Sequence, residues 1–485
     1  MGIHSLTKSQ KVHEQLDHPV IDTDGHMLEF TPVFFDYLKE VGGPDIVART
    51  QAGFRQDLGR GWRDFTLEER RDRGIMRLPF WGAPTKNKID RATAVLPRLM
   101  RERLPSFGID YSIVYPTIGF LLPDFSDDEV RQAACRAQNV MLADLFRDCA
   151  DRLTPAATIP CHTPEEAIAE LDFAVDTLGF KVAMLGNLVR RPIKAFAHLD
   201  PDLAGSAYWI DTLALDSLYD YDPLWQKCID LKVAVTAPSG TQGIDVRRSC
   251  TNYMFNQTGH FAEAGHAFAR ALFFGGVTHR FPTLNFAFLE CGVAWGATLL
   301  CDLKERWNKR NREAVQQFNP AYLDAEHLDR MFKKYGGDVF RGKMLSASGT
   351  SASRFAVSPS GRSTEDSEDF DDFAATGMTK LEDLYDRFVS NFYFGCEADD
   401  PTTINAFNCE MLPFGAKLKA MISSDIGHWD VPDMTRCIPN AYEIVENGLM
   451  SEDNFRDFML INPAGFFTRQ NPEFFKGTVL EGYDL

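Results

Sequence analysis

Acidic and imidazole side chains follow a short apolar run near the start of the chain, in Asp22-Thr-Asp24-Gly-His26. Because successive side chains of a strand point to opposite faces, Asp24 and His26 can face the same way. A carboxylate and an imidazole at this spacing are suited to a divalent metal ion. The same residues are also typical of a turn that leads into a helix N-cap, so the pattern alone leaves both interpretations open.

A second group of such residues opens a predicted helix, in His260-Phe-Ala-Glu263-Ala-Gly-His266. Residues three apart share a helix face, and Glu-x-x-His is the pattern of helical di-iron sites. At about 100° per residue, however, His260 and His266 are about 120° apart. Both reach one centre only if the helix start is distorted, and an ordinary polar helix face is the alternative.

Two further candidate ligands come directly after apolar runs late in the chain. Glu290 follows Leu289, and a carboxylate there is costly to bury without a charged partner or a metal ion. Asp425 and His428 follow Ser423-Ser424, with Asp425 the stronger ligand candidate. His428 is a candidate ligand, proton shuttle or brace for a ligand. For each of these residues the alternative is a helix N-cap or a salt bridge.

The elements that must position these residues are eight short apolar runs separated by helical patterns. The runs are His18–Asp24, Tyr111–Pro116, Leu153–Ile159, Lys181–Leu185, Lys232–Thr236, Leu284–Leu289, Phe392–Cys396 and Leu418–Ser423. Nearly continuous apolar runs are typical of parallel strands that are buried on both faces. Eight of them alternating with helices predict an α/β fold, a (β/α)8 TIM barrel. The rival doubly wound sheet lacks its usual GxGxxG after the first strand.

Domain boundaries follow from the uneven spacing of these runs. We expect an N-terminal extension at 1–17, the barrel at 18–435 and a C-terminal helical extension at 436–485. Long insertions after strands one, four and six span 30–108, 186–230 and 291–390. The last contains a Ser-rich and then acidic loop at 345–375, which is typical of a lid or a disordered loop.

Composition excludes several classes of protein. The 485 residues carry a net charge of −18, which argues against nucleic acid as the main partner. No apolar run is long enough to span a membrane, and the first residues contain no secretory signal. The ten cysteines include no CxxC pair, so neither a disulfide framework nor a cysteine zinc site is expected, and a cytoplasmic location is the default.

Three segments together resemble the amidohydrolase-related branch of metal-dependent TIM barrels, over Val20 to about Met434. Ile21–His26 stands where that family places Ile-Asp-x-His-x-His, Phe274–Glu290 resembles its segment leading into strand six, and Ser424-Asp425 with His428 resembles its strand-eight signature. Asp24 and Glu290 stand where the family has histidines, and its strand-five histidine is absent, since Ala237-Pro-Ser239 occupies that position.

This exchange of imidazoles for carboxylates is similar to the non-haem di-iron monooxygenase subgroup, typified by the diterpenoid hydroxylase of platensimycin and platencin biosynthesis. The resemblance implies two iron ions, O2 activation and hydroxylation of an unactivated carbon in a bulky terpenoid-like acid, carried as a coenzyme A thioester or as the free acid. Two basic stretches, Arg98–Arg103 and Arg190–Lys194, are candidates to meet the coenzyme A phosphates, and a solvated face is the alternative. An external reductase or ferredoxin is the expected electron donor, and a homodimer is expected at the level of the family.

For that activity the predicted metal ligands are seven residues, with Asp22 and His428 as residues that orient ligands or move protons. The predicted ligands are Asp24, His26, His260, Glu263, His266, Glu290 and Asp425. The alternative function is a zinc- or manganese-dependent decarboxylase or hydrolase, the commoner chemistry of the wider family, with Asp425 as base. A non-catalytic binding barrel with a degraded site is the third hypothesis.

Overall fold

The computed structural model describes residues 6–56, 60–77, 86–196, 198, 207–238, 240–318, 322, 324–340 and 371–483. Its strands are β1 (Ile21–Met27), β2 (Tyr111–Pro116), β3 (Leu153–Pro155), β4 (Ala157–Ile159), β5 (Val182–Leu185), β6 (Val189–Pro192), β7 (Tyr208–Asp211), β8 (Ala234–Thr236), β9 (Phe286–Phe288), β10 (Phe392–Cys396) and β11 (Lys419–Ile422). Seven of the eight predicted apolar runs contain one of these strands or, at 153–159, two of them, and the run His18–Asp24 overlaps the first half of β1.

The strands pair in parallel in the orders β1-β2-β3 and β4-β5-β8-β9-β10-β11. β3 and β4 are two halves of one predicted strand, and the Ala156 amide between them donates to Val114 O at 3.0 Å. Only β6 and β7 stand apart, as an antiparallel hairpin.

Contacts between β1 and β11 close the sheet. The Asp425 amide donates to Asp24 O at 2.9 Å, and the His26 amide donates to Ile426 O at 2.7 Å. The Thr23 hydroxyl adds a bond to Ile422 O at 2.6 Å. Eight parallel strands in a closed ring confirm the predicted (β/α)8 TIM barrel.

The barrel interior is filled by alternate side chains of the strands, since every second residue points inward. Along β2 these are Tyr111, Ile113 and Tyr115, all buried. The C-terminal segment completes this core with four aromatic residues, Phe466, Phe467, Phe474 and Phe475. Burial of side chains of this size stabilises the fold by about 1.5–3 kcal/mol each. The residues after β11 therefore form part of the barrel core.

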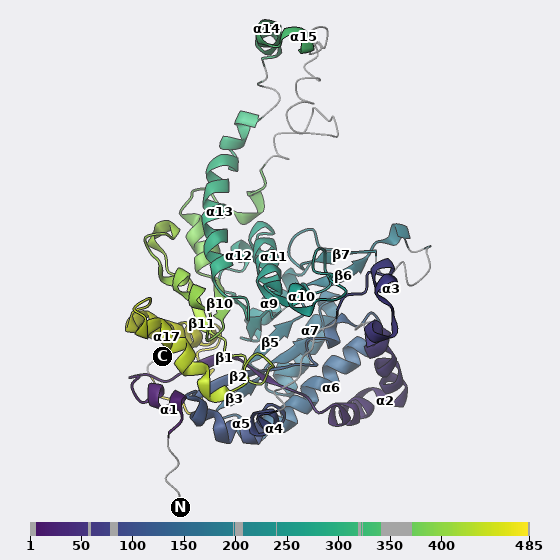
Figure 1. Ribbon diagram of the computed structural model, residues 1–485, viewed down its shortest axis with the longest axis vertical. Helices are drawn as coiled ribbons and strands as arrows, with labels where there is room; N and C mark the ends of the chain where they lie inside the picture. Colours follow the sequence, from purple (N-terminus) through teal and green to yellow (C-terminus); the bar gives the residue numbers. More distant parts are fainter. Residues whose placement is uncertain are drawn as a thin grey trace, which may run out of the picture.

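The helices cover the outside of the barrel (Figure 1). They are α1 (Lys8–His13), α2 (Thr31–Gln56), α3 (Leu67–Asp72), α4 (Lys88–Val95), α5 (Pro97–Arg103), α6 (Asp128–Phe146), α7 (Pro164–Asp172), α9 (Asp222–Asp230), α10 (Tyr253–Gln257), α11 (His260–Phe274), α12 (Val277–Arg280), α13 (Ala294–Arg310), α14 (Ala325–Tyr335), α15 (Gly337–Phe340), α17 (Cys437–Glu446), α18 (Glu452–Arg456) and α19 (Asn462–Gln470).

Helix α6 shows how local sequence sets these elements. Asp127 is its N-cap, and the side chain accepts hydrogen bonds from the amides of Glu129 and Val130. Its apolar residues, among them Val130, Ala134 and Met141, are buried against the rest of the chain. A capped helix with one buried stripe is the arrangement that the amphipathic pattern predicts.

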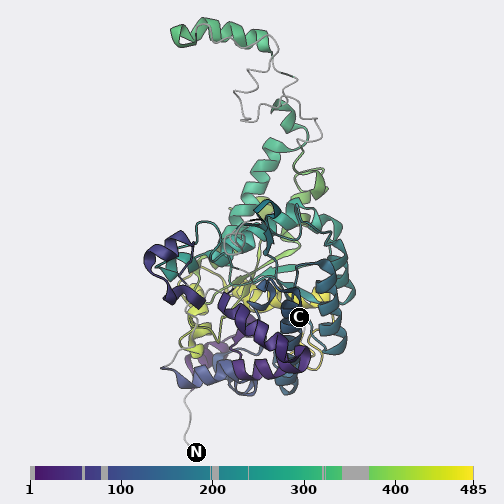
Figure 2. The ribbon, with the colours of Figure 1, turned by 90° about the vertical axis from the view of Figure 1, so that its right-hand side faces the viewer.

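One extension departs from this compact arrangement. Helix α13 rises from the barrel, and α14 and α15 stand at the far end of the extension (Figures 1 and 2). This extension belongs to the insertion predicted at 291–390. Most of the Ser-rich and acidic loop predicted at 345–375 lies outside the described residues, and the predicted domain boundaries stay predictions. Among the helices that the structure describes, none combines the length and the apolar character needed to cross a membrane.

Candidate metal centre

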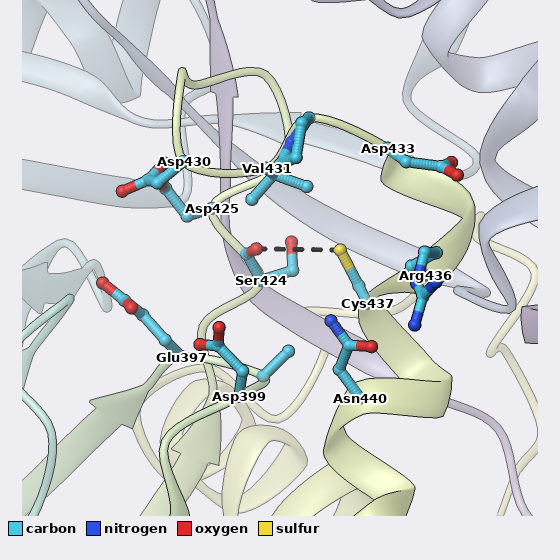
Figure 3. A pocket seen from close by; sticks show the side chains of 12 residues that line it. Glu397, Asp399, Ser424, Asp425, Asp430, Val431, Asp433, Arg436, Cys437 and Asn440 are labelled. Carbon is cyan, nitrogen blue, oxygen red and sulfur yellow. Dashed lines mark hydrogen bonds between the residues drawn. The ribbon is translucent and has the colours of Figure 1, made fainter.

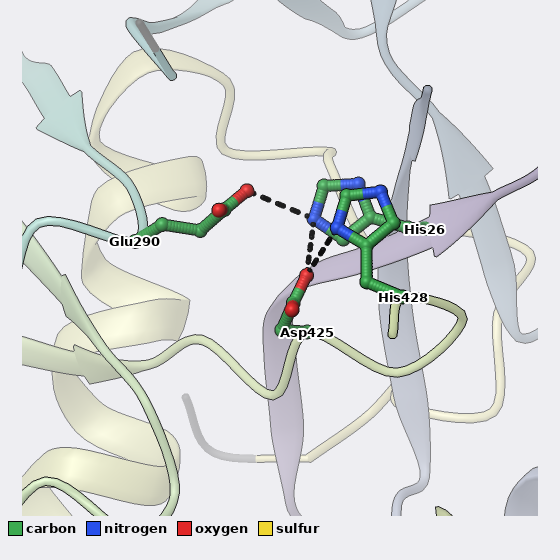
Figure 4. A group of neighbouring side chains, drawn as sticks. All are labelled: His26, Glu290, Asp425 and His428. Atoms are coloured by element: carbon green, nitrogen blue, oxygen red, sulfur yellow. Dashed lines mark ion pairs between the residues drawn. The ribbon is translucent and has the colours of Figure 1, made fainter. Parts of the chain in front are cut away.

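Four side chains from distant parts of the sequence meet at the mouth of the barrel. They are His26 on β1, Glu290 after β9, and Asp425 and His428 after β11, and each offers a ligand atom within 4.8 Å of the others (Figure 4). All four lie at or beyond the C-terminal ends of strands, where TIM barrels carry their active sites. Among the described residues, no other group of three or more potential ligands meets this criterion.

The backbone at two of these positions is strained. Glu290 has φ of 55° and Asp425 has φ of 53°, in the left-handed region that side chains other than glycine rarely adopt. Such a conformation costs about 1–3 kcal/mol and persists only when its surroundings hold it. Gly427 at φ 105° completes the turn, because a Cβ atom there would lie 2.2 Å from His26 O.

The imidazole of His26 is the centre of the group. Its Nε2 atom lies 3.0 Å from Asp425 Oδ1, 3.1 Å from Glu290 Oε1 and 3.2 Å from Asp24 Oδ1. Asp24 and His26 are fully buried, and the side chain of Asp425 is 2% exposed. Asp24, which the sequence predicted as a ligand, therefore borders the group.

These four atoms share an unusual property: none has a hydrogen-bond partner, and neither does Asp425 Oδ2. Buried polar atoms without partners are costly, and their convergence on one point is explained by a bound cation. Six ligands about 2.1 Å from one ion lie about 3.0 Å from their neighbours, whereas four tetrahedral ligands lie about 3.4 Å apart. The observed spacing fits a single divalent ion and is nearer to the six-ligand arrangement.

The pKa shifts of the group also favour a bound cation. Burial, reinforced by the charges of Asp425 and Asp24, raises the pKa of Glu290 to about 8. Burial opposes a charge on His26, but the carboxylates of Asp24 and Asp425 outweigh it and raise the pKa of the imidazole. The negative charge of the carboxylates thus exceeds the positive charge of the neighbouring imidazole, and a divalent cation would balance the excess.

His428 is held in a defined orientation. Its ring stacks on that of His26, with centroids 3.6 Å apart, and its Nε2 lies 2.9 Å from Thr117 Oγ1. His428 Nδ1 lies 2.7 Å from Asp425 Oδ1, a contact that requires a proton on this nitrogen. In the neutral ring Nε2 therefore carries the lone pair, and it accepts from the Thr117 hydroxyl. His428 is thereby preset as a ligand or a proton carrier.

Asp22 acts differently from its neighbours. Its Oδ1 accepts from the amides of Ser424 and Asp24, and its Oδ2 accepts from the Ser112 hydroxyl at 2.6 Å. It thus ties β1, β2 and the turn after β11 together. The Ser423 hydroxyl donates to Asp24 Oδ2 at 2.6 Å in a similar way. The structure places Asp22 as a brace of the site, in line with its predicted orienting role.

A cavity of about 160 Å³ adjoins the group on the side of Asp425 (Figure 3). Its lining residues are mostly polar and come from the segments after β10 and β11: Glu397, Ala398, Asp399, Ser424, Asp425, Asp430, Val431, Pro432, Asp433, Arg436, Cys437 and Asn440. Burial, together with the charge of Asp425, raises the pKa of Glu397 to about 8. Glu397 directly follows β10, so the end of this strand contributes to the acidic surroundings of the group.

Three predicted ligands are not brought into the group. His260, Glu263 and His266 lie on α11, a regular helix from its first residue, so the distortion that would let both histidines reach one centre is absent. Glu263 forms a bidentate ion pair with Arg247, with both contacts at 2.5 Å. The seven-ligand set is corrected accordingly.

The two histidines of α11 have other surroundings. His266 packs against Trp295, with ring centroids 5.9 Å apart. His260 is buried against Gly240, where a Cβ atom would lie 2.1 Å from Nδ1. Helical spacing indicates which residues of α11 are neighbours on its surface, but it does not indicate towards which part of the protein they point.

Sequence reasoning overlooked Thr117, because a single threonine after a strand carries no signal. It also assigned the basic stretch 98–103 to an anionic ligand. There the arginines are engaged by carboxylates, in ion pairs of Arg98 with Asp148, Arg101 with Asp151 and Arg103 with Asp90. This stretch therefore has no free guanidinium face for coenzyme A.

Comparison with known proteins adds family context. A family model described as amidohydrolase matches residues 120–346, which supports the amidohydrolase-related resemblance seen in the sequence. No curated protein matches the sequence.

Three solved structures illustrate the likeness in fold. A 2,6-dihydroxybenzoate decarboxylase from Rhizobium is 14% identical with a TM-score of 0.49, over 93% of this chain and 99% of that one. A dihydroxybenzoic acid decarboxylase from Polaromonas sp. JS666 with bound manganese is 17% identical with a TM-score of 0.48, over 94% and 99%. A 5-carboxyvanillate decarboxylase from Novosphingobium aromaticivorans, complexed with manganese, is 14% identical with a TM-score of 0.46, over 93% and 96%.

These findings overturn the monooxygenase prediction. The matched family model is that of an amidohydrolase, so the O2-dependent, di-iron and terpenoid-hydroxylating interpretation is wrong. The two-iron cofactor falls with it, since the described residues offer one four-membered group rather than seven ligands. The findings agree with the alternative, a zinc- or manganese-dependent decarboxylase or hydrolase. The physical reason for the error is that carboxylates replacing histidines are compatible with several metals and reactions.

Proposed function

We propose that this chain is a divalent-metal-dependent lyase that decarboxylates an organic acid, with a metal-dependent hydrolase as the second candidate. The observation that carries the proposal is the convergence at the barrel mouth of buried atoms of Asp24, His26, Glu290 and Asp425, which face one another across 3.0–3.2 Å without a hydrogen-bond partner. A purely structural ion-pair cluster would be expected to satisfy these atoms.

The residues that would hold the ion are His26, Glu290 and Asp425, with His428 Nδ1 and Asp24 as further ligands. One imidazole with several carboxylates is a set that suits manganese as well as zinc. Manganese, the ion named in two of the structures above, is the first ion to test. When bound, such an ion supplies Lewis-acid polarisation of the substrate's oxygens.

The chain's own residues would do the rest of the work. In decarboxylation the bond between the carboxyl carbon and the neighbouring carbon breaks, CO2 leaves, and the electron pair on the remaining carbon takes up a proton. His428 is placed to carry that proton, because Thr117 holds its Nε2 and its Nδ1 lies at the centre, 2.7 Å from Asp425 Oδ1. The buried walls around His26 exclude bulk water, which strengthens these interactions.

Decarboxylation is preferred over hydrolysis because of the charge of the ligand set. Several anionic ligands reduce the ability of a divalent ion to ionise a water molecule, which hydrolysis requires and decarboxylation does not. In the hydrolase alternative, Asp425 would be the base that accepts a proton from water. That alternative is favoured by its position at the edge of the cavity.

The test begins with metal content. Purified protein is stripped with a chelator, reloaded with Mn²⁺ or Zn²⁺, and assayed anaerobically for CO2 release from a panel of aromatic and aliphatic acids. We expect about one ion per chain, turnover without O2, and loss of both in Glu290→Gln and Asp425→Asn.

Glu263→Gln is the matched control, since it makes the same chemical change outside the group and should retain metal and turnover. Full metal binding by the Glu290 and Asp425 variants would refute the site. Ester or amide hydrolysis by the loaded protein, with no CO2 release from any acid, would select the hydrolase.

A further inference from the structure

A group of arginines held by aromatic rings lies on the same face of the barrel as the metal centre. Trp62, in the segment between α2 and α3, packs against two of them. The guanidinium carbon of Arg70 lies 3.7 Å from the ring centroid, and that of Arg77 lies 4.0 Å from it. Stacking on an aromatic face holds a guanidinium by its plane and leaves its N–H edge available.

Tyr208 on the β6–β7 hairpin forms a second such contact. Arg190 and Arg248 lie 5.3 Å and 5.8 Å from its ring centroid. Arg248 is fixed further by donating to the Tyr208 hydroxyl and to Gly243 O, both at 2.6 Å. We refer to Arg70, Arg77, Arg190 and Arg248 as the arginine lip.

The two halves of the lip form one surface. The Trp62 indole donates to Cys250 O at 2.9 Å, and the Arg77 amide donates to Ser249 O at 2.7 Å. Arg248 also lies beside the segment after α3, since a Cβ atom on Gly74 would be 3.6 Å from its guanidinium. In Figure 1, α3, the β6–β7 hairpin and α10 accordingly lie close together.

This surface adjoins the metal centre. The segments that carry it follow β1, β5 and β8, so they leave the barrel at the same end as Glu290 and Asp425. The ring of Tyr253 on α10 contacts that of Trp429, the residue after His428, with centroids 6.3 Å apart. The lip and the metal centre therefore lie on neighbouring loops at one end of the barrel.

The lip arginines differ from their neighbours in charge pairing. Arg191 and Arg247, next to them in the sequence, form ion pairs with Asp211 and Glu263. Within the residues that the structure describes, no ion pair with a carboxylate involves any lip arginine. Four cations without a close ion pair repel each other, although Arg190 has a longer-range attraction to the Asp124 carboxyl. A protein of net charge −18 has many carboxylates that could have neutralised all four.

We propose that the arginine lip binds a phosphate-bearing end of the substrate whose carboxyl end is held at the metal centre. Guanidinium edges match phosphate oxygens in paired hydrogen bonds, and several of them together favour a group with more than one negative charge. This inference rests on the proposed function for the carboxyl end. It adds the substrate class, an organic acid that carries a phosphate or diphosphate group.

Isothermal titration of the full chain with inorganic pyrophosphate tests the lip alone. The protein is first freed of metal by a chelator and dialysed, so that the probe cannot bind through an ion. We expect binding at low salt that weakens as salt rises, because charged contacts are screened. Each lost charge-assisted contact is expected to weaken binding about tenfold or more.

Arg190→Gln and Arg77→Gln are the test variants, because neither side chain makes a hydrogen bond within the described residues and neither change should disturb the fold. Arg98→Gln is the matched control, since Arg98 is exposed and pairs with Asp148 elsewhere on the barrel. We expect the first two variants to lose affinity and Arg98→Gln to stay within about twofold of the parent chain.

No binding by the parent chain, or an equal loss in all three variants, would overturn the proposal. Equal binding of sulfate and pyrophosphate would also overturn it, because it would show only a general attraction for anions. Since the titration uses metal-free protein, failure of the metal centre leaves this result unchanged, and the two proposals fail separately.

Discussion

Glu290→Gln should stabilise the protein when metal is removed and weaken it when metal is present. The substitution keeps the shape of the side chain and removes one negative charge from the group around His26. In the metal-free protein a charge at Glu290 would be buried beside Asp24 and Asp425, so the folded chain must hold this carboxyl protonated, and replacing it with an uncharged amide should be favourable. With metal bound, the same charge is a ligand, and its loss should be unfavourable.

The magnitude for the metal-free form follows from the pKa of Glu290, which burial raises from 4.5 to about 8. At pH 7 the folded chain keeps this carboxyl protonated, whereas the unfolded chain releases the proton. That difference costs about 3 kcal/mol of stability. Because the folded pKa is raised, this stability is lost as pH rises from about 4.5 to about 8. The side-chain amide of the variant does not titrate, so the advantage of the variant should grow over the same range.

The magnitude for the metal-loaded form follows from linkage. An ion present at a hundred times its dissociation constant stabilises the folded chain by about 2.7 kcal/mol, and loss of a ligand should remove most of this gain. At about 2.1 cal/mol/K per residue, the unfolding entropy of 485 residues makes 3 kcal/mol equal to about 3 °C in Tm. The variant should therefore melt about 3 °C above the parent without metal, and should gain little from Mn²⁺.

The assay is thermal and urea unfolding at pH 5, 7 and 8, with chelator or with Mn²⁺. Glu263→Gln is the control, because Glu263 pairs with Arg247 and its loss should be mildly unfavourable in both conditions. If Glu290→Gln destabilises the chelated protein at pH 7 by about 1 kcal/mol or more, Glu290 acts as a structural ion-pair partner. The reasoning from unmatched buried charge would then be refuted.

Three further outcomes are expected. Thr117→Val removes the hydrogen bond that holds His428 Nε2, and turnover should fall about 10–100-fold with metal content unchanged, as measured by steady-state kinetics and metal analysis; unchanged turnover would exclude the orienting role. Burial lowers the pKa of His162 to about 3, so below pH 6.5 this histidine is protonated in the unfolded chain but not in the folded one, and the folded chain loses stability. His162→Gln should remove about 2 kcal/mol of the stability that is lost between pH 7 and pH 5. Equal losses of stability in the variant and the parent over this range would contradict the prediction. Gly427→Ala places a Cβ atom 2.2 Å from His26 O at φ 105°, and should cost more than about 2 kcal/mol in urea unfolding; a cost near zero would show that the turn relaxes freely.

Much of the fold was predictable because of how parallel barrels are built. Their strands are buried on both faces, so the eight runs read as nearly continuous apolar segments, and each contains or overlaps the strand expected of it. The division of one run into β3 and β4 at Ala156 was not predictable, since it depends on which neighbour each half pairs with. The role of the C-terminal phenylalanines in closing the barrel core also required the tertiary structure.

The candidate site was likewise only partly predictable from the sequence. Asp24, His26, Glu290 and Asp425 were found because the end of a strand places a side chain at a known end of the barrel, and the structure brings them together. That they bind metal stays a prediction. The prediction of ligands on α11 was wrong because the local sequence does not show that Arg247, sixteen residues before Glu263, forms an ion pair with its carboxylate.

The sequence by itself determined the alternation of strands and helices, the end of the barrel where chemistry can occur, and the kinds of ligand atom available there. Only the tertiary structure decided which of those atoms share one point, how many positive charges they lack, and which arginines are left without a carboxylate. The physical reason is range: backbone periodicity and burial are set by near neighbours, whereas charge balance depends on groups hundreds of residues apart in the chain.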